Sequence, residues 1–169
     1  MRLQRKLQEL SRTGQALLAT NFYNFETLSG VLQAAKAKRK SIILQLSESS
    51  IHYLGLYVAA NMARAALKEY EVEGWLHLDH GSSIELVKQC LDAGFDSVMI
   101  DASERSFEEN VKITAQVVKQ ASHYNANVEA ELGYVAKLGQ AQATGQYTQP
   151  HEAKQFVEAT GIQDRKSVV

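Results

Sequence analysis

Short apolar runs recur five times along the chain, and each is followed by a segment in which apolar residues return every three or four positions. The runs span residues 16–23, 41–47, 75–79, 97–101 and 127–132. Runs of this length are typical of buried strands, and the spacing that follows them is typical of helices. Strands that alternate with helices predict a parallel sheet built from right-handed βαβ units. We therefore expect one α/β domain without an internal linker.

The helical segments carry signals for where they begin. Residues 51–70 are predicted to form one continuous helix after the second apolar run. Ser82-x-x-Glu85 and Ser106-x-x-Glu109 have the spacing of capping boxes, in which a hydroxyl and a carboxylate satisfy backbone N–H groups at a helix start. The third and fourth strand–helix units are therefore expected to begin their helices at these serines.

Each predicted strand ends on a polar residue. The five residues are Asn21, Ser47, Asp79, Asp101 and Glu131. Positions of the opposite parity are mostly aliphatic, and side chains alternate between the two faces of a strand. In a (β/α) barrel the aliphatic set would pack against helices, and the polar set would line the mouth at the C-terminal strand ends. Three carboxylates converging there would repel one another unless a cation were bound, which favours a metal site.

Simpler explanations exist for each of these residues taken alone. An aspartate after a strand often caps the next helix, and a histidine at a strand end is usually held by structural hydrogen bonds. The repetition over five strands, with His80 directly beside Asp79, favours a functional site. The sequence has no GxGxxG, GxxxxGK[ST], CxxC or HExxH motif, so the common dinucleotide, nucleotide and zinc signatures are absent.

Several motifs occur in an order that resembles a known family. The segments LHLDHGSS, DAGFDSVMIDAS, FEEN and VEAELG are similar to those of the class II, zinc-dependent fructose-bisphosphate or ketose-bisphosphate aldolases, and the similarity extends from about residue 16 to residue 162. The resemblance implies a (β/α)8 TIM barrel, of which about five βα units would be present, in a homo-oligomeric parent protein. It also implies reversible aldol cleavage of a phosphorylated ketose, of the fructose- or tagatose-bisphosphate type, to dihydroxyacetone phosphate and an aldehyde phosphate.

The resemblance assigns chemical roles at two adjacent positions. Asp79 resembles the catalytic acid, and His80 resembles one of three histidines that hold a catalytic Zn²⁺. Zinc would act as a Lewis acid on the ketone. The alternative route, in which a lysine forms a Schiff base, needs a lysine at a strand end. Lys137 lies in a loop and the other lysines lie in predicted helices, so the metal route is favoured.

The remaining strand ends have counterparts in the same family. Asp101 and Glu131 resemble metal ligands at a second or alternative cation position, and Asn21 and Ser47 resemble substrate-binding residues. No carboxylate occurs between Glu131 and Glu152, so the resemblance leaves open which group abstracts the proton.

Residues 1–163 are therefore expected to form the N-terminal part of one aldolase barrel. Members of the family have three further strands, which carry the other two zinc histidines and most of the phosphate-binding loops. Residues 164–169 place charges where an apolar sixth strand is expected, which predicts a non-native tail and an inactive fragment. Two alternatives remain open: a non-catalytic phosphosugar-binding half-barrel, and a small self-contained, doubly wound α/β domain that binds Mg²⁺.

Composition narrows the range of partners. The 169 residues are 45% apolar with a net charge of −1, so no global field favours nucleic acid or an anionic membrane. Cys90 is the one cysteine, which rules out an internal disulfide and fits a reducing compartment. No apolar run approaches the roughly 20 residues of a membrane span, and the N-terminus does not resemble a signal peptide. We expect a cytoplasmic protein without a nucleic-acid or membrane partner.

Overall fold

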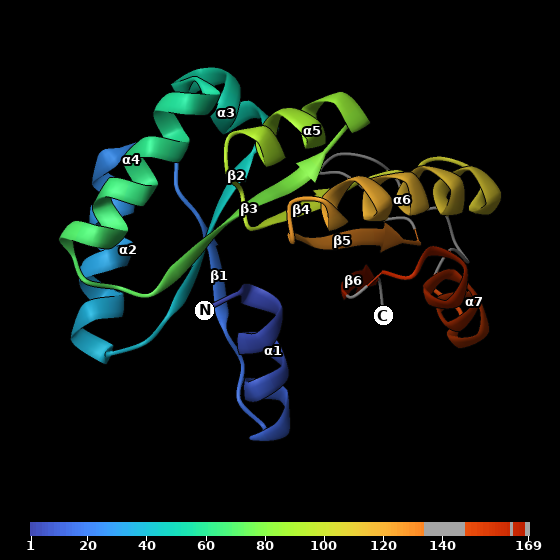
Figure 1. The fold of residues 1–169 in the computed structure, drawn as a ribbon, viewed down its shortest axis with the longest axis horizontal. Helices are drawn as coiled ribbons and strands as arrows, with labels where there is room; N and C mark the ends of the chain where they lie inside the picture. The colour runs from blue at the N-terminus through green and yellow to red at the C-terminus, as the bar shows by residue number, and fades with distance from the viewer. Residues whose placement is uncertain (134–147, 163, 168–169) are drawn as a thin grey trace, which may run out of the picture.

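A computed structural model of the chain describes residues 1–133, 148–162 and 164–167. The strands are β1 (Leu18–Asn21), β2 (Ile42–Ser47), β3 (Gly74–Gly81), β4 (Ser97–Ile100), β5 (Asn127–Leu132) and β6 (Asp164–Ser167). The helices are α1 (Leu3–Arg12), α2 (Phe25–Lys38), α3 (Glu48–Leu54), α4 (Leu56–Glu69), α5 (Ile84–Asp92), α6 (Phe107–Ser122) and α7 (Pro150–Thr160). Strands and helices alternate along the chain, as expected (Figure 1).

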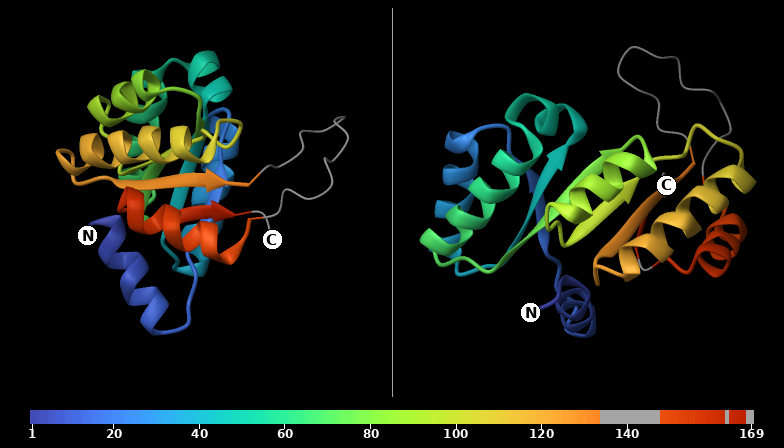
Figure 2. Two further views of the ribbon diagram at one scale, coloured as in Figure 1. Left: turned by 90° about the vertical axis from the view of Figure 1, so that its right-hand side faces the viewer. Right: turned by 45° about the horizontal axis from the view of Figure 1, so that its top comes forward.

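All six strands belong to one parallel sheet in the order β1-β2-β3-β4-β5-β6. Helices α2 to α7 lie along one face of the sheet (Figures 1 and 2). Helix α1 stands apart from them, and the carbonyl oxygen of Met1 accepts a 3.0 Å hydrogen bond from Nε1 of Trp75 at the start of β3. A sequential order without reversal rules out the doubly wound alternative, because that fold needs a point where the strand order switches direction.

The hydrophobic core lies between the sheet and its helices. It contains the aliphatic parity of the strands, for example Leu44, Leu76, Val98 and Val128, each at most 1% exposed. Leu18 is the exception at 67% exposure, since β1 is an edge strand. The polar parity therefore faces the opposite side of the sheet, as the alternation predicted.

A sixth strand lies within residues 164–169, the segment that the sequence analysis interprets as a non-native tail. β6 pairs in parallel with β5, from Glu129 opposite Asp164 to Leu132 opposite Ser167. The sequence pattern missed this strand because the pattern reports side-chain burial, whereas pairing depends on backbone groups.

Two local predictions about helices need correction. Residues 51–70 are not one helix, because Gly55 has φ of +84° and separates α3 from α4. Helix α5 is capped by Ser83, which accepts a hydrogen bond from the backbone N–H of Leu86, and not by Ser82. Ser82 instead hydrogen-bonds Glu48, and this contact is the main reason why the pKa of the Glu48 carboxyl is lowered. The capping box at Ser106 is confirmed.

None of the helices that the structure describes combines the length and the apolarity needed to cross a bilayer. The carboxylate-free loop between Glu131 and Glu152 lies mostly at residues 134–147, outside the described residues.

Candidate functional site

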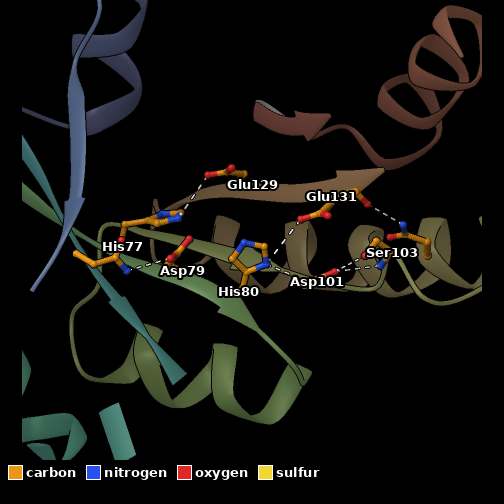
Figure 3. Close-up of polar contacts among 9 residues, drawn as sticks. His77, Asp79, His80, Asp101, Ser103, Glu129 and Glu131 are labelled. Atoms are coloured by element: carbon orange, nitrogen blue, oxygen red, sulfur yellow. Dashed lines mark hydrogen bonds and ion pairs between the residues drawn. The ribbon is translucent and has the colours of Figure 1, made fainter. Parts of the chain in front are cut away.

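The end of β3 is irregular, and this brings two neighbouring side chains to one site. Leu78 pairs with Val98, but Gly81 pairs with Ile100, so β3 has one residue more than β4 over this interval. His80 has φ of +54°, in the left-handed region. In a regular strand Asp79 and His80 would point to opposite faces. A bulge of this kind re-aims side chains, so both residues can serve the polar face (Figure 3).

Three of the predicted site residues converge beside this bulge. Nδ1 of His80 lies 2.9 Å from Oδ2 of Asp101 and 3.7 Å from Oε2 of Glu131 (Figure 3). One ligand atom from each of the three residues lies within 4.8 Å of the others. The residues come from the ends of three adjacent strands. Strand parity predicted the places of Asp101 and Glu131, whereas His80 reaches the cluster because of the bulge. Glu131 is only 2% exposed, so this carboxylate lies in a dry environment where charge interactions are strong.

Asp101 is held as an anion by its neighbours. The hydrogen bond with His80 is the largest influence and lowers the pKa of the Asp101 carboxyl well below its usual range, although burial acts in the opposite direction. The backbone N–H and the hydroxyl of Ser103 donate to Oδ1 of Asp101 at 3.2 and 2.7 Å. Sequence reasoning missed Ser103. The signal available was the aspartate at the strand end, since an Asp side chain commonly accepts a hydrogen bond from the backbone N–H two residues further on.

The backbone of Glu131 is fixed from the helix side. The amide of Asn110, on α6, donates to the carbonyl oxygen of Glu131 at 2.9 Å. The hydroxyl of Thr114 donates in turn to Oδ1 of Asn110 at 3.1 Å. Both α6 side chains are buried. The sequence reasoning did not single out Asn110, although a polar residue on the apolar face of a helix is a signal for a buried hydrogen bond.

Asn21 and Asp79 meet across the polar face. Nδ2 of Asn21, at the end of β1, donates to Oδ2 of Asp79 at 3.0 Å. The two strands are separated by β2 in the sheet. The contact therefore spans the polar face and orients the Asp79 carboxylate at the mouth.

Ser47 is in register with Asp79 but is used locally. Its hydroxyl oxygen accepts a 3.3 Å hydrogen bond from the backbone N–H of Ser50 and caps α3. It also lies within 3.0 Å of the hydroxyls of Ser49 and Ser50. The structure thus places Ser47 beside the mouth without joining it to the cluster around His80.

The donor set fits a divalent cation. One imidazole nitrogen and two carboxylate oxygens are ligands for Zn²⁺ or Mn²⁺, and the oxygen-rich set also suits harder ions. The negative charge of Asp101 and Glu131 needs compensation in a buried setting, which a cation would supply. Tetrahedral zinc with three protein ligands typically has more nitrogen than this, so the described residues alone offer a modest zinc site.

Comparison with known proteins gives consistent matches. A family model described as Fructose-bisphosphate aldolase class-II matches residues 1–164. The fructose-bisphosphate aldolase of Giardia intestinalis is 38% identical over 162 residues, which are 95% of this chain and 50% of that protein. The fructose-bisphosphate aldolase of Geobacillus stearothermophilus is 41% identical over 163 residues, which are 92% of this chain and 56% of that protein.

Solved structures show the same fold. The crystal structure of the YdjI aldolase from Escherichia coli K12 superposes with a TM-score of 0.87 at 28% identity, over 99% of this chain and 61% of that chain. The chain spans about half the length of the curated relatives that it matches. The six strands and their helices therefore correspond to part of the fold of these aldolases.

Proposed function

Because the chain belongs to the class II fructose-bisphosphate aldolase family, we propose that it carries one part of a metal-dependent site for reversible aldol cleavage of a phosphorylated ketose. The observation that carries this proposal is the convergence of His80, Asp101 and Glu131 at the strand ends, with Asp79 beside them. Catalytic groups of parallel barrels are found at these ends.

In this proposal His80 is the ligand of a Zn²⁺ ion, and Asp101 and Glu131 hold the same ion or a second cation nearby. The ion, when bound, would polarise the ketone carbonyl and stabilise the enediolate that remains after cleavage. Asp101 accepts from Ser103 through one oxygen and contacts His80 through the other, so it fixes the imidazole ring. Groups that hold a ligand in this way tune the affinity of a metal site.

Asp79 has the acid–base role in the proposal. In the cleavage direction its carboxylate takes the proton from the hydroxyl on the carbon at which the sugar chain breaks, and in the condensation direction it returns that proton. The Asn21 amide donates to Oδ2 of this carboxylate and so fixes its orientation. Asn21 and Ser47, whose strands flank the mouth, are proposed to contact the substrate. The products would be dihydroxyacetone phosphate and an aldehyde phosphate.

A second candidate is phosphosugar binding without turnover. It is favoured by the single imidazole in the metal cluster of the described residues and by the share of the relatives' length that the chain covers. Catalytic zinc sites usually have three protein ligands with open positions for substrate. A chain that supplies only part of a site could retain ligand affinity and lose the reaction.

One pair of measurements separates the two candidates. The chain would be titrated with dihydroxyacetone phosphate by calorimetry in the presence of zinc, and then assayed for cleavage of fructose and tagatose bisphosphates. Asp79→Ala serves as the background control, since it removes the proposed acid and leaves the three cation donors in place. Turnover above this control supports the enzyme, saturable binding without turnover supports the binding module, and the absence of both contradicts both candidates.

A further inference from the structure

A second polar group lies on the same face of the sheet, one layer below the metal cluster. His77, on β3, is 3% exposed, and its Nδ1 lies 2.8 Å from Oγ of Ser97 on β4. Its Nε2 lies 3.4 Å from Oε2 of Glu129 on β5 (Figure 3). One imidazole thus joins the side chains of three consecutive strands.

The polarity of this layer is unusual for a barrel interior. Layers of inward side chains in (β/α) barrels are mostly branched and apolar. Burial of an imidazole and a carboxylate is costly unless each contacts a partner of matching polarity. The contacts of His77 with Ser97 and Glu129 satisfy that condition. Because burial of these polar side chains is costly, we infer that their contacts serve to fix the arrangement of β3, β4 and β5.

His77 lies directly before the bulge in β3, so its contacts can affect the side chains that the bulge carries. His77 pairs with Ser97 in the register of β3 and β4, one step before the ladder is disturbed between Leu78 and Gly81. The disturbed interval contains Asp79 and His80. Below it, His77 ties β3 to the neighbouring strands, and above it His80 contacts Asp101 and Glu131.

We propose that His77 is a positioning residue that fixes β3 against β4 and β5 directly below the bulge, and so sets the separation of the three cation donors above it. This inference rests on the proposed function only in requiring that His80, Asp101 and Glu131 bind a divalent cation. It assigns no proton transfer or substrate contact to His77.

The test measures cation affinity and requires no turnover. The chain is titrated with cobalt(II) chloride, and the dissociation constant is obtained from the ligand-field absorbance of the bound ion. His77→Ala should raise this constant about ten-fold or more, the range expected when a residue that orients metal ligands is removed. His77→Gln, which can keep a polar atom towards Glu129, and His77→Asn, which can keep one towards Ser97, should each lose less.

Ser97→Ala tests whether His77 influences cobalt affinity through its contact with β4, and it does so without altering any charge near the cation. If His77 acts through the tie to β4, the double variant His77→Ala/Ser97→Ala should bind cobalt no more weakly than His77→Ala alone, because interacting residues are not additive. Leu32→Ala is the control for a purely structural loss. Leu32 is fully buried on α2, an element that carries none of the three cation donors, so its truncation should lower the unfolding midpoint and leave cobalt affinity unchanged.

The possible outcomes are distinguishable. Cobalt affinity of His77→Ala within two-fold of the unmodified chain overturns the inference, and so does an equal loss in Leu32→Ala at matched folded fraction. A chain with no saturable cobalt site overturns both this inference and the metal part of the proposed function. In a third outcome the unmodified chain binds cobalt, His77→Ala binds it more weakly, and the chain shows no aldol cleavage. This result supports the positioning role and contradicts only the catalytic part of the proposed function.

Discussion

At the scale of the residue, the two neighbours Asp79 and His80 differ in their partners. His80 supplies the one nitrogen of the three-residue cluster, whereas the Asp79 carboxylate is engaged by Asn21. We predict that His80→Ala weakens zinc or cobalt binding about 100-fold or more, since removal of a direct ligand should exceed the 10–100-fold loss typical of supporting residues. Asp79→Ala should leave the affinity within a few-fold. Calorimetric titration checks both, and equal losses in the two variants would contradict the assignment of roles.

Cys90 gives a second prediction at this scale. It is fully buried on α5, and burial raises the pKa of its thiol to about 12. The thiolate is the reactive form, so we expect no modification by iodoacetamide at pH 8 in the folded protein and complete modification in denaturant. Because the folded pKa is raised, this thiol's contribution to stability is complete below the unfolded pKa and declines at higher pH, by up to roughly 1.4 kcal/mol per pH unit. Rapid labelling without denaturant would contradict the prediction.

At the scale of the element, the bulge of β3 depends on a glycine. A Cβ atom added to Gly81 would lie 2.7 Å from Cδ2 of Leu78 and 2.9 Å from the carbonyl oxygen of Met99. We predict that Gly81→Ala lowers the free energy of unfolding by about 1–3 kcal/mol, the usual cost of overpacking, and also weakens cation binding.

A matched control is available on α2. Gly30→Ala meets no atom within 4 Å and lies inside a helix, where alanine is favoured over glycine by about 0.5–1 kcal/mol. Chemical denaturation of both variants should therefore give changes of opposite sign. A neutral Gly81→Ala would show that the backbone here can move away from Met99 at little cost.

The elements also show which features a sequence pattern can predict. The alternation of apolar and polar residues along β5 correctly predicted that Glu131 lies on the polar face. Such a prediction is possible because the pattern of neighbouring residues alone shows which face of a strand is buried. The break at Gly55 and the bulge at His80 were not predicted, since both depend on backbone angles that the periodicity of apolar residues does not encode. The same holds for Asn110, whose partner is a backbone carbonyl on another element. Local patterns thus predicted β1 to β5 and the places of Asp101 and Glu131, and missed β6 and the contacts that adjust the cluster.

At the scale of the whole molecule, the sheet has two edges. β1 and β6 each pair with one strand of the described sheet, and Leu18 on β1 is 67% exposed. Edge strands present backbone groups that can pair with another chain. We predict concentration-dependent self-association of the isolated chain in sedimentation velocity, and a larger monomer fraction for Leu18→Lys.

The control for this prediction is an exposed apolar residue away from the edge. Val58, on α4, is 62% exposed, so Val58→Lys removes a comparable apolar side chain from a helix surface. It should change the monomer fraction less than Leu18→Lys does. Equal effects of the two substitutions would point to nonspecific association through exposed apolar surface.

The sequential strand order has a consequence for how the site forms during folding. Each strand pairs with the strand that precedes it in the chain, so the sheet can grow by one strand–helix unit at a time as the chain is made. The Asn21–Asp79 contact can form once β3 has docked, but His80 meets Glu131 only after β5 is added. During synthesis the Asp79 carboxylate is therefore oriented before the three proposed cation donors are assembled, and a bound divalent ion would stabilise the later, more complete intermediate.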